Sequence, residues 1–527
     1  MTTAPIEAPP LIAALMDAAA YDHPVVEIRL LETHISWVLL TGDYAYKIKK
    51  PVDLGFLDFS TLDKRRVYCE EELRLNRRLA ADAYLDVVPI TGSPDRPVLG
   101  GQGDAIEYAV RMVQFAQDAQ LDRVLQRGEL EPQQLDALAR LVADFHEKIA
   151  VADKDSDYGE PATVCHAVKE NFQQIRKCLP PDEAATQLDH LEAWSAATCT
   201  RLNKVFSQRK AGGFVRECHG DMHLRNLAWV DGRPLVFDCI EFNPQLSWID
   251  VISEIAFLVM DLQDRDQPRL AWRFLNTYLE HCGDYAGLKV LPFYLAYRAI
   301  VRAKVEVIRA SQPGITTEEQ AAVLKEFHGY LQLANNYTHA TRPVLIITRG
   351  LSASGKSTVT QSLLEQLGAI RIRSDVERKR LYAMSAETDA RSDVGKGIYD
   401  AEAGRQTYEK LAELAGQVLA AGYTAIVDAA CLKTEQVTLF RKLAESSEVA
   451  FIILECTAPA DILRRRIAQR EKGVSDADLS VLEHQLSNWQ ELPKDDQAFR
   501  ITVNTENPVN IESLMEQING IRLTAVP

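Results

Sequence analysis

The sequence contains no Cys-x-x-Cys pair and no run of 18 consecutive apolar residues. Its nine cysteines are scattered singly over 527 residues. This spacing excludes a paired zinc motif and predicts reduced thiols rather than a disulfide framework. The absence of a long apolar run excludes a transmembrane helix. The N-terminus also lacks the basic segment with which a signal peptide begins. We therefore expect a cytoplasmic protein that does not bind a membrane.

Basic residues are too few for a broad nucleic-acid-binding face. Lys and Arg number 59 against 75 Asp and Glu, which gives a net charge of −16. Residues 341–527 hold 23 basic and 26 acidic side chains, so most of the acidic excess lies in the first 340 residues. Nucleic-acid binding requires a basic surface, and this balance argues against it. An acidic first part is compatible with a cationic substrate, although a solvated acidic surface accounts for it more simply.

The hydrophobic pattern changes near residue 341. Before that point, alternating residues at 25–48 predict strands, 62–80 has the leucine spacing of a helix, and the later part is mostly helical. After it, buried-strand runs alternate with helices, which predicts a parallel sheet covered on both faces. We expect an α+β domain over 1–338 and an α/β domain over 343–527.

The second domain begins with a phosphate-binding loop. Residues 350–357, Gly-Leu-Ser-Ala-Ser-Gly-Lys-Ser, match the Walker A pattern G-x-x-x-x-G-K-[ST] between a predicted strand and a predicted helix. Backbone amides of such a loop surround the β-phosphate of ATP at the positive end of the helix. The lysine is expected to reach the β- and γ-phosphates, and the serine is expected to hold Mg²⁺. The predicted nucleotide-binding residues are Gly350, Ser354, Gly355, Lys356, Ser357 and Thr358.

Three polar features follow this loop along the chain. Asp375 lies after the second predicted strand, where it could take the proton of an acceptor hydroxyl. Arg378 stands one helical turn away and could orient the substrate. Equally, Asp375 could simply cap the N-terminus of a charged helix. Asp428 ends another strand and is placed to bind Mg²⁺ or its water, or is simply an acid at the edge of the sheet. Arg466 and Arg470 share one face of an Arg-rich helix, which predicts either a lid over the phosphates or a solvated basic face.

Together these features resemble the gluconate kinase, zeta toxin and polynucleotide kinase branch of P-loop phosphotransferases. The resemblance covers residues 343–527. It implies that Asp375 is the catalytic base, that Arg378 binds substrate, and that Arg466 and Arg470 are lid arginines. The Walker signature is specific to P-loop proteins, and the remaining residues narrow the class to kinases without naming a substrate.

The first domain carries a different kinase signature. Residues 218–226 read Cys-His-Gly-Asp-Met-His-Leu-Arg-Asn, in which Asp221 precedes Asn226 by the five residues of a protein-kinase catalytic loop. A predicted hairpin with an Asp-Gly turn follows and leads to Asp238. This order resembles the aminoglycoside phosphotransferase and choline kinase family, of protein-kinase-like fold with two lobes. The resemblance implies that Asp221 is the catalytic base and that Asn226 and Asp238 are Mg²⁺ ligands.

The same resemblance assigns supporting roles to three residues. His219 and His223 are implied as structural supports of the loop, and Asp250 as the acid that ties a later helix to it. Over the full length, the pair of domains resembles bacterial bifunctional aminoglycoside phosphotransferase and ATP-binding proteins.

In the small lobe, Lys47 resembles the lysine that grips the α- and β-phosphates, with Glu72 as its ion-pair partner. Lys49 and Glu71 are close neighbours in the sequence, so the pairing is open by one or two residues. Residues 112–114 are expected to form the hinge beside adenine.

One part of the kinase pattern is missing. No Gly-rich loop lies between Leu30 and Leu40, so the phosphate clamp must be built differently. The small lobe is expected over about 25–115 and the large lobe over about 116–338.

The leading hypothesis is an ATP- and Mg²⁺-dependent phosphotransferase with two kinase modules, each acting on a hydroxyl of a small molecule. In one alternative, one module is a nucleotide-sensing or pseudokinase regulator of the other. In another alternative, the P-loop module phosphorylates 5′-hydroxyl groups of nucleic acid. The net negative charge of this module argues against that alternative.

Overall fold

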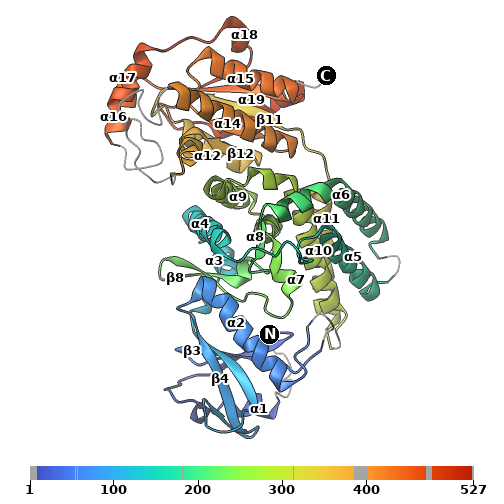
Figure 1. Ribbon diagram of the computed structural model, residues 1–527. Helices are drawn as coiled ribbons and strands as arrows, with labels where there is room; N and C mark the ends of the chain where they lie inside the picture. Colours follow the sequence, from blue (N-terminus) through green and yellow to red (C-terminus); the bar gives the residue numbers. More distant parts are fainter. Residues whose placement is uncertain are drawn as a thin grey trace. The chain divides into compact units, whose positions relative to one another are not determined.

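The computed structural model describes residues 9–53, 55, 57–180, 183–312, 314–384, 401–469 and 478–524 (Figure 1). The chain forms two units, one of residues 1–167 with 206–261 and one of residues 168–205 with 262–527. These units do not follow the boundary expected near residue 341, because helices that precede this boundary pack with the second domain. The boundary itself, which concerns the order of domains along the chain, stays a prediction.

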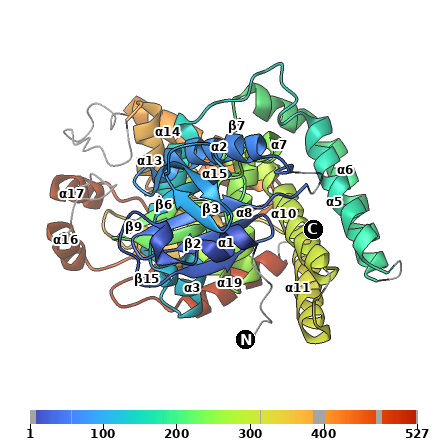
Figure 2. The ribbon, with the colours of Figure 1, turned by 90° about the horizontal axis from the view of Figure 1, so that it is seen from below.

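The first unit begins with a six-stranded antiparallel sheet, of strand order β1-β2-β3-β6-β4-β5. Strands β2, β3 and β6 lie side by side in Figure 2. Helix α2 packs on β4 and β6 through Cys69 and neighbouring buried residues; it starts at Thr61, whose hydroxyl accepts a hydrogen bond from the Lys64 amide. The elements of this part are α1 (Pro10–Ala14), η1 (Ala18–Ala20), β1 (Arg29–Glu32), β2 (Ser36–Leu40), β3 (Tyr44–Lys49), α2 (Leu62–Ala80), β4 (Tyr84–Ser93), β5 (Arg96–Leu99) and β6 (Glu107–Val113).

A three-residue turn joins β1 to β2 where a protein kinase has its Gly-rich loop. The Thr33 hydroxyl accepts hydrogen bonds from the amides of Ile35, at 3.3 Å, and Ser36, at 2.9 Å. A threonine side chain therefore closes this turn, in the segment where the sequence lacks a Gly-rich loop.

The rest of the first unit is mostly helical and carries two short strand pairs, β7 with β10 and β8 with β9. Its elements are η2 (Gln117–Ala119), α3 (Leu121–Gln126), α4 (Pro132–Lys148), β7 (Val215–Glu217), η3 (Leu224–Asn226), β8 (Leu227–Val230), β9 (Arg233–Val236), α7 (Pro244–Ser247) and β10 (Trp248–Asp250). Helices α5 (Pro161–Cys178), α6 (Ala185–Ala211) and α8 (Val251–Asp264) each contain residues of both units.

The second unit contains a five-stranded sheet of order β12-β13-β11-β14-β15, in which every pair is parallel. The strand order reverses at β11, because β12 and β13 lie on one side of it and β14 and β15 on the other. Val344, Ile346 and Ile452 are among the apolar residues of its core. The sheet strands are β11 (Val344–Arg349), β12 (Ile370–Arg373), β13 (Ala425–Asp428), β14 (Ala450–Thr457) and β15 (Arg500–Asn504).

The helices of the second unit that follow residue 343 complete the α/β fold predicted for that range. Helices α10 and α11, which precede it, lie side by side in Figures 1 and 2. The helices that lie within the second unit are α9 (Pro268–Cys282), η4 (Tyr285–Lys289), α10 (Leu291–Ala310), α11 (Thr317–Asn336), α12 (Lys356–Leu367), α13 (Ser374–Leu381), α14 (Ala401–Ala420), α15 (Thr434–Ser446), α16 (Ala460–Ala468), α17 (Leu479–Ser487), α18 (Lys494–Gln497) and α19 (Ile511–Thr524).

The structure corrects the expectation that all nine cysteines are reduced. Cys165 and Cys199 are disulfide-bonded, whereas the seven other cysteines are free thiols. Residue spacing did not indicate this, because each cysteine stands alone in its stretch of sequence, Cys165 within α5 and Cys199 within α6. Among the described residues, no helix combines the length and the apolar character needed to cross a membrane.

Candidate active sites

A buried cluster of ion pairs joins the small-lobe sheet to helix α2. Lys47, in β3, lies 2.8 Å from Glu72 Oε1, and Lys49 lies 2.7 Å from Glu72 Oε2. Glu71 instead pairs with Arg74 on the surface. Glu72 therefore binds both lysines, one with each oxygen, which resolves the pairing that the sequence left open.

Each lysine also contacts a second carboxylate. Lys47 pairs with Asp238 and Lys49 with Glu241. Burial of Glu72 acts to raise its pKa, but the two ammonium groups lower it to about 2. Burial likewise disfavours charged Lys47, yet the surrounding carboxylates, Asp238 first, raise its pKa well above the usual value. Glu72 and Lys47 are thus both charged at neutral pH. The sequence offered Lys49 only as an alternative to Lys47 and did not point to Glu241, although Glu241 stands only three residues after Asp238.

Within the loop of residues 218–226, the side chain of Asn226 is hydrogen-bonded to Asp221. Asn226 Nδ2 donates to the Asp221 carboxylate and to the Asp221 backbone carbonyl, both at 3.0 Å. His223 Nε2 lies 3.3 Å from the same carboxylate. His219 accepts from the Asp221 amide at Nδ1 and contacts the Phe237 carbonyl with Nε2, at 2.7 Å. The two histidines therefore hold the loop in shape.

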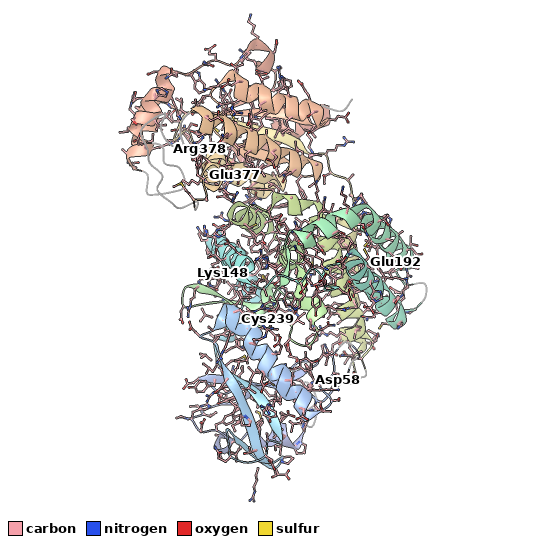
Figure 3. The ribbon with its side chains drawn as sticks, viewed as in Figure 1. Asp58, Lys148, Glu192, Cys239, Glu377 and Arg378 are labelled. Atoms are coloured by element: carbon pink, nitrogen blue, oxygen red, sulfur yellow. The ribbon has the colours of Figure 1, made fainter. Side chains whose placement is uncertain are left out.

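Asp238 is delivered by the β8–β9 hairpin, as the sequence predicted. Its backbone has a φ of 66°, and its amide donates to the Tyr84 hydroxyl at 3.1 Å. The next residue, Cys239 (labelled in Figure 3), donates its amide to Asn76 Oδ1. These contacts hold a left-handed backbone that is costly for a non-glycine residue, so the position of the Asp238 carboxylate is determined by its surroundings.

Helix α8 supports the catalytic loop through two acids that sequence reasoning missed. Glu254 accepts the backbone amides of His219, at 2.7 Å, and Gly220, at 2.9 Å. Asp261 accepts the Leu224 amide at 2.8 Å. Asp250, to which the resemblance gave the role of tying helix to loop, instead forms a buried bidentate pair with Arg209, at 2.6 and 2.8 Å. This corrects the assignment, since it is Glu254 and Asp261 that bind the loop amides.

The Walker loop lies at the carboxyl end of β11, where the strand order reverses and α/β proteins bind their ligands. Gly350 has a φ of 149°, and a Cβ there would lie 2.4 Å from the Cys456 carbonyl oxygen. Gly355, with a φ of 81°, precedes the first residue of α12. Lys356 donates to the carbonyls of Gly350, at 2.9 Å, and Leu351, at 2.7 Å, so its ammonium lies within the loop. Burial lowers the pKa of Lys356, against the opposing effect of nearby carboxylates, Asp428 first.

Two polar side chains accompany this loop. Asp428, at the end of β13, is buried and accepts the Thr360 hydroxyl at 3.3 Å. Ser357 is the second residue of α12 and is exposed. Carboxylate and hydroxyl oxygens are the hard donors that Mg²⁺ prefers, so the donor set at this edge of the sheet fits that ion.

The predicted acceptor-side residues lie on α13, where Figure 3 labels Arg378 beside Glu377. Asp375 is in the first turn of α13, and it is Arg373, not Asp375, that takes the N-cap position. Arg378 Nε lies 3.4 Å from the Thr407 hydroxyl. The roles of Asp375 as base and of Arg378 as substrate ligand stay predictions.

Arg466 contacts the Walker loop directly. It donates to the Ala353 carbonyl at 3.2 Å and to the Thr505 hydroxyl at 3.1 Å. Thr505 in turn donates to the Ser354 carbonyl, and Gln485 accepts the Ser352 amide at 2.7 Å. Arg466 thus braces the loop backbone. Arg470, its predicted partner, lies outside the described residues.

Two family models match this chain. A model described as phosphotransferase enzyme family matches residues 57–291, and an AAA domain matches residues 345–492. An uncharacterized protein of Mycobacterium tuberculosis (strain ATCC 25618 / H37Rv) is 30% identical over 460 residues, which cover 87% of this chain and 89% of that protein. The chain belongs to this family of fused phosphotransferase and P-loop proteins.

This chain carries two kinase-like modules. An amicoumacin kinase in complex with AMP-PNP is 15% identical, with a TM-score of 0.38, over 58% of this chain and 88% of that one. A gluconokinase from Sinorhizobium meliloti 1021 is 20% identical, with a TM-score of 0.24, over 35% of this chain and 95% of that one. These likenesses are too low to indicate a substrate.

Proposed function

We propose that this protein transfers the γ-phosphoryl group of ATP to a hydroxyl of a small molecule, with Mg²⁺ as cofactor, at two separate sites. The observation that carries the proposal is the cluster in the first module, where Lys47 contacts both Glu72 and Asp238. Kinases bind phosphates with a lysine that pairs with a helix glutamate, close to an acid that holds Mg²⁺. Here Glu72 is the helix glutamate and Asp238 is the acid that would hold Mg²⁺.

In the first module, Asp221 is the base that takes the proton of the acceptor hydroxyl. Its carboxylate is oriented by Asn226, so the lone pair that receives the proton has a defined direction. Bound Mg²⁺ would neutralise the charge on the phosphates, and Asn226 and Asp238 provide oxygen donors of the type that it prefers. Lys47 would orient the α- and β-phosphates.

In the second module, the Walker loop binds the phosphates of ATP with its amides and with Lys356. Ser357 and Asp428 supply the oxygen donors for Mg²⁺, and Asp375 would take the acceptor proton. Both modules act by positioning and charge stabilisation, since phosphoryl transfer needs little covalent help from the protein.

The test is transfer of label from γ-labelled ATP into a pool of small hydroxyl-containing metabolites. Wild type is compared with Asp221→Ala, Lys356→Ala and the double variant. We expect each single variant to lose a different labelled product, and the double variant to lose both. A product that persists in the double variant would contradict the proposal. Loss with one variant alone would limit catalysis to that module and favour a regulatory role for the other.

A further inference from the structure

Helix α9 packs alongside β12, the edge strand of the P-loop sheet. Both belong to the second unit, although α9 lies in the range matched by the phosphotransferase model rather than by the AAA domain. Asn276 of α9 donates to the Ala369 carbonyl at 2.9 Å and accepts the Arg371 amide at 2.7 Å. Its carboxamide therefore pairs with the outer edge of β12 as a neighbouring strand would.

This pairing aligns one face of α9 with β12. Trp272, Asn276 and Glu280 are spaced by four residues and share a face of the helix. Trp272 packs on Gly368, where an added Cβ would lie 2.8 Å from the indole. Four helical residues advance about 6 Å and two strand residues about 6.6 Å. A step from Asn276 to Glu280 along the helix thus matches a step from Arg371 to Arg373 along the strand.

Glu280 accordingly contacts both arginines. Its Oε1 lies 2.9 Å from Arg373 Nη1, and its Oε2 lies 3.5 Å from Arg371 Nη2. The Glu280 and Arg373 side chains are each 18% exposed. Arg371 also donates to the carbonyl of Ser357, the predicted Mg²⁺ ligand, at 3.3 Å. One carboxylate from α9 therefore binds two cations beside the Walker loop.

The same arginines have a second acid within reach. Arg373 and Asp428 are register partners on the neighbouring parallel strands β12 and β13. Burial acts to lower the pKa of Arg373, but the charges of Glu280 and then Asp428 raise it overall. Asp375 also acts on Arg373, but Asp428 is the carboxylate besides Glu280 that acts on both arginines. Without Glu280, both guanidinium groups would therefore be drawn to Asp428. An Asp428 carboxylate paired with arginine would be a poorer ligand for a cation.

We propose that Glu280 is a positioning residue of the P-loop site, which holds Arg371 and Arg373 so that the Asp428 carboxylate stays available to Mg²⁺ and its nucleotide. The inference rests on the proposed function of the P-loop module. Glu280 lies outside residues 345–492, which the AAA domain matches, so the P-loop module would use an acid from outside that range.

The experiment measures binding of a fluorescent ADP analogue to the full chain, with Mg²⁺ and with EDTA. The P-loop component is the binding that Lys356→Ala removes. In Glu280→Gln we expect the Mg²⁺-dependent increase in affinity to fall by about tenfold or more, with binding in EDTA not weakened. Glu280→Asp should restore part of this increase.

A matched control is the ion pair between Arg273 of α9 and Glu365 of α12, at 3.1 Å and with exposures of 19% and 18%. Glu365 lies eight residues along α12 from Ser357, about 12 Å away, and we expect Glu365→Gln to keep the wild-type Mg²⁺ dependence. Adding Arg373→Met to Glu280→Gln should restore much of the Mg²⁺ dependence, because it removes the arginine that lies in register with Asp428. This double variant also tests the inference if the single one folds poorly.

Three outcomes would overturn the inference. They are equal losses in Glu280→Gln and Glu365→Gln, equal losses with Mg²⁺ and EDTA, and failure of Arg373→Met to restore the dependence. If wild type has no binding that Lys356→Ala removes, the proposed function of the module itself fails, and the inference fails with it.

Discussion

The ammonium of Lys49 lies 2.7 Å from Glu72 Oε2, on the opposite carboxylate oxygen from the one that binds Lys47. Lys49 also neutralises Glu241, and all three side chains of this group are buried. The two lysines thus have different partners: Lys47 reaches Asp238 of the proposed catalytic site, whereas Lys49 pairs with the buried Glu72 and Glu241.

The first prediction tests what each lysine does. Lys49→Met leaves Glu241 buried without its cation and should lower the free energy of unfolding by about 3–5 kcal/mol. Lys47→Met leaves Glu72 paired with Lys49, so it should cost less stability and yet abolish phosphotransfer by the first module. Chemical denaturation and the labelled-ATP assay measure the two effects. Equal destabilisation by both variants would contradict this division.

The second prediction concerns the support of the catalytic loop. Glu254→Gln leaves one carbonyl oxygen to accept the amides of His219 and Gly220, where the carboxylate offers two. We expect kcat of the first module to fall by about 100-fold because the loop shifts, with little change in KM for ATP. Activity of the P-loop module is the internal control. A large rise in KM with kcat unchanged would show that Glu254 serves nucleotide binding instead.

The third prediction is a pH dependence of stability. Burial, assisted by Arg216, lowers the pKa of His146 from 6.5 to about 3. Below pH 6.5 the unfolded chain binds a proton at His146 that the folded chain does not, so acid favours unfolding. Stability should fall by about 1.4 kcal/mol per pH unit between pH 6 and 4 from this residue. Denaturation of wild type and His146→Gln gives the free energy of unfolding across this range. Its slope against pH should differ between the two by the equivalent of one bound proton. Identical slopes would refute the lowered pKa of His146.

The fourth prediction tests the Walker loop. Gly350→Ala places a Cβ 2.4 Å from the Cys456 carbonyl oxygen at a φ of 149°, and the strain should weaken nucleotide binding by at least about tenfold. Gly404→Ala, in α14, is the control, since a Cβ there meets no atom within 4 Å. Titration with a fluorescent ADP analogue compares the two. Unchanged affinity in Gly350→Ala would mean that the loop does not bind phosphate in this conformation.

Motifs in which residues are close along the chain were predictable from the sequence. The Walker loop needs only a strand, glycines and a helix in succession, and the spacing of Asp221 and Asn226 lies within one loop. The two fold classes also followed, because strand alternation and strand–helix alternation are local patterns. The family comparisons and the sheet topologies confirm both classes.

Tertiary structure alone decided which distant residues meet. Glu254, Glu241 and Glu280 look like ordinary acids in the sequence, since nothing local marks an acid whose partner is tens or hundreds of residues away. Asp250 was assigned wrongly for this reason, and the disulfide bonds of Cys165 and Cys199 were not foreseen. The sequence by itself determined the Walker loop, the spacing of Asp221 and Asn226, and the fold class of each domain. Only packing decided which carboxylate balances each buried cation, because that choice depends on distances of a few ångströms between separate elements.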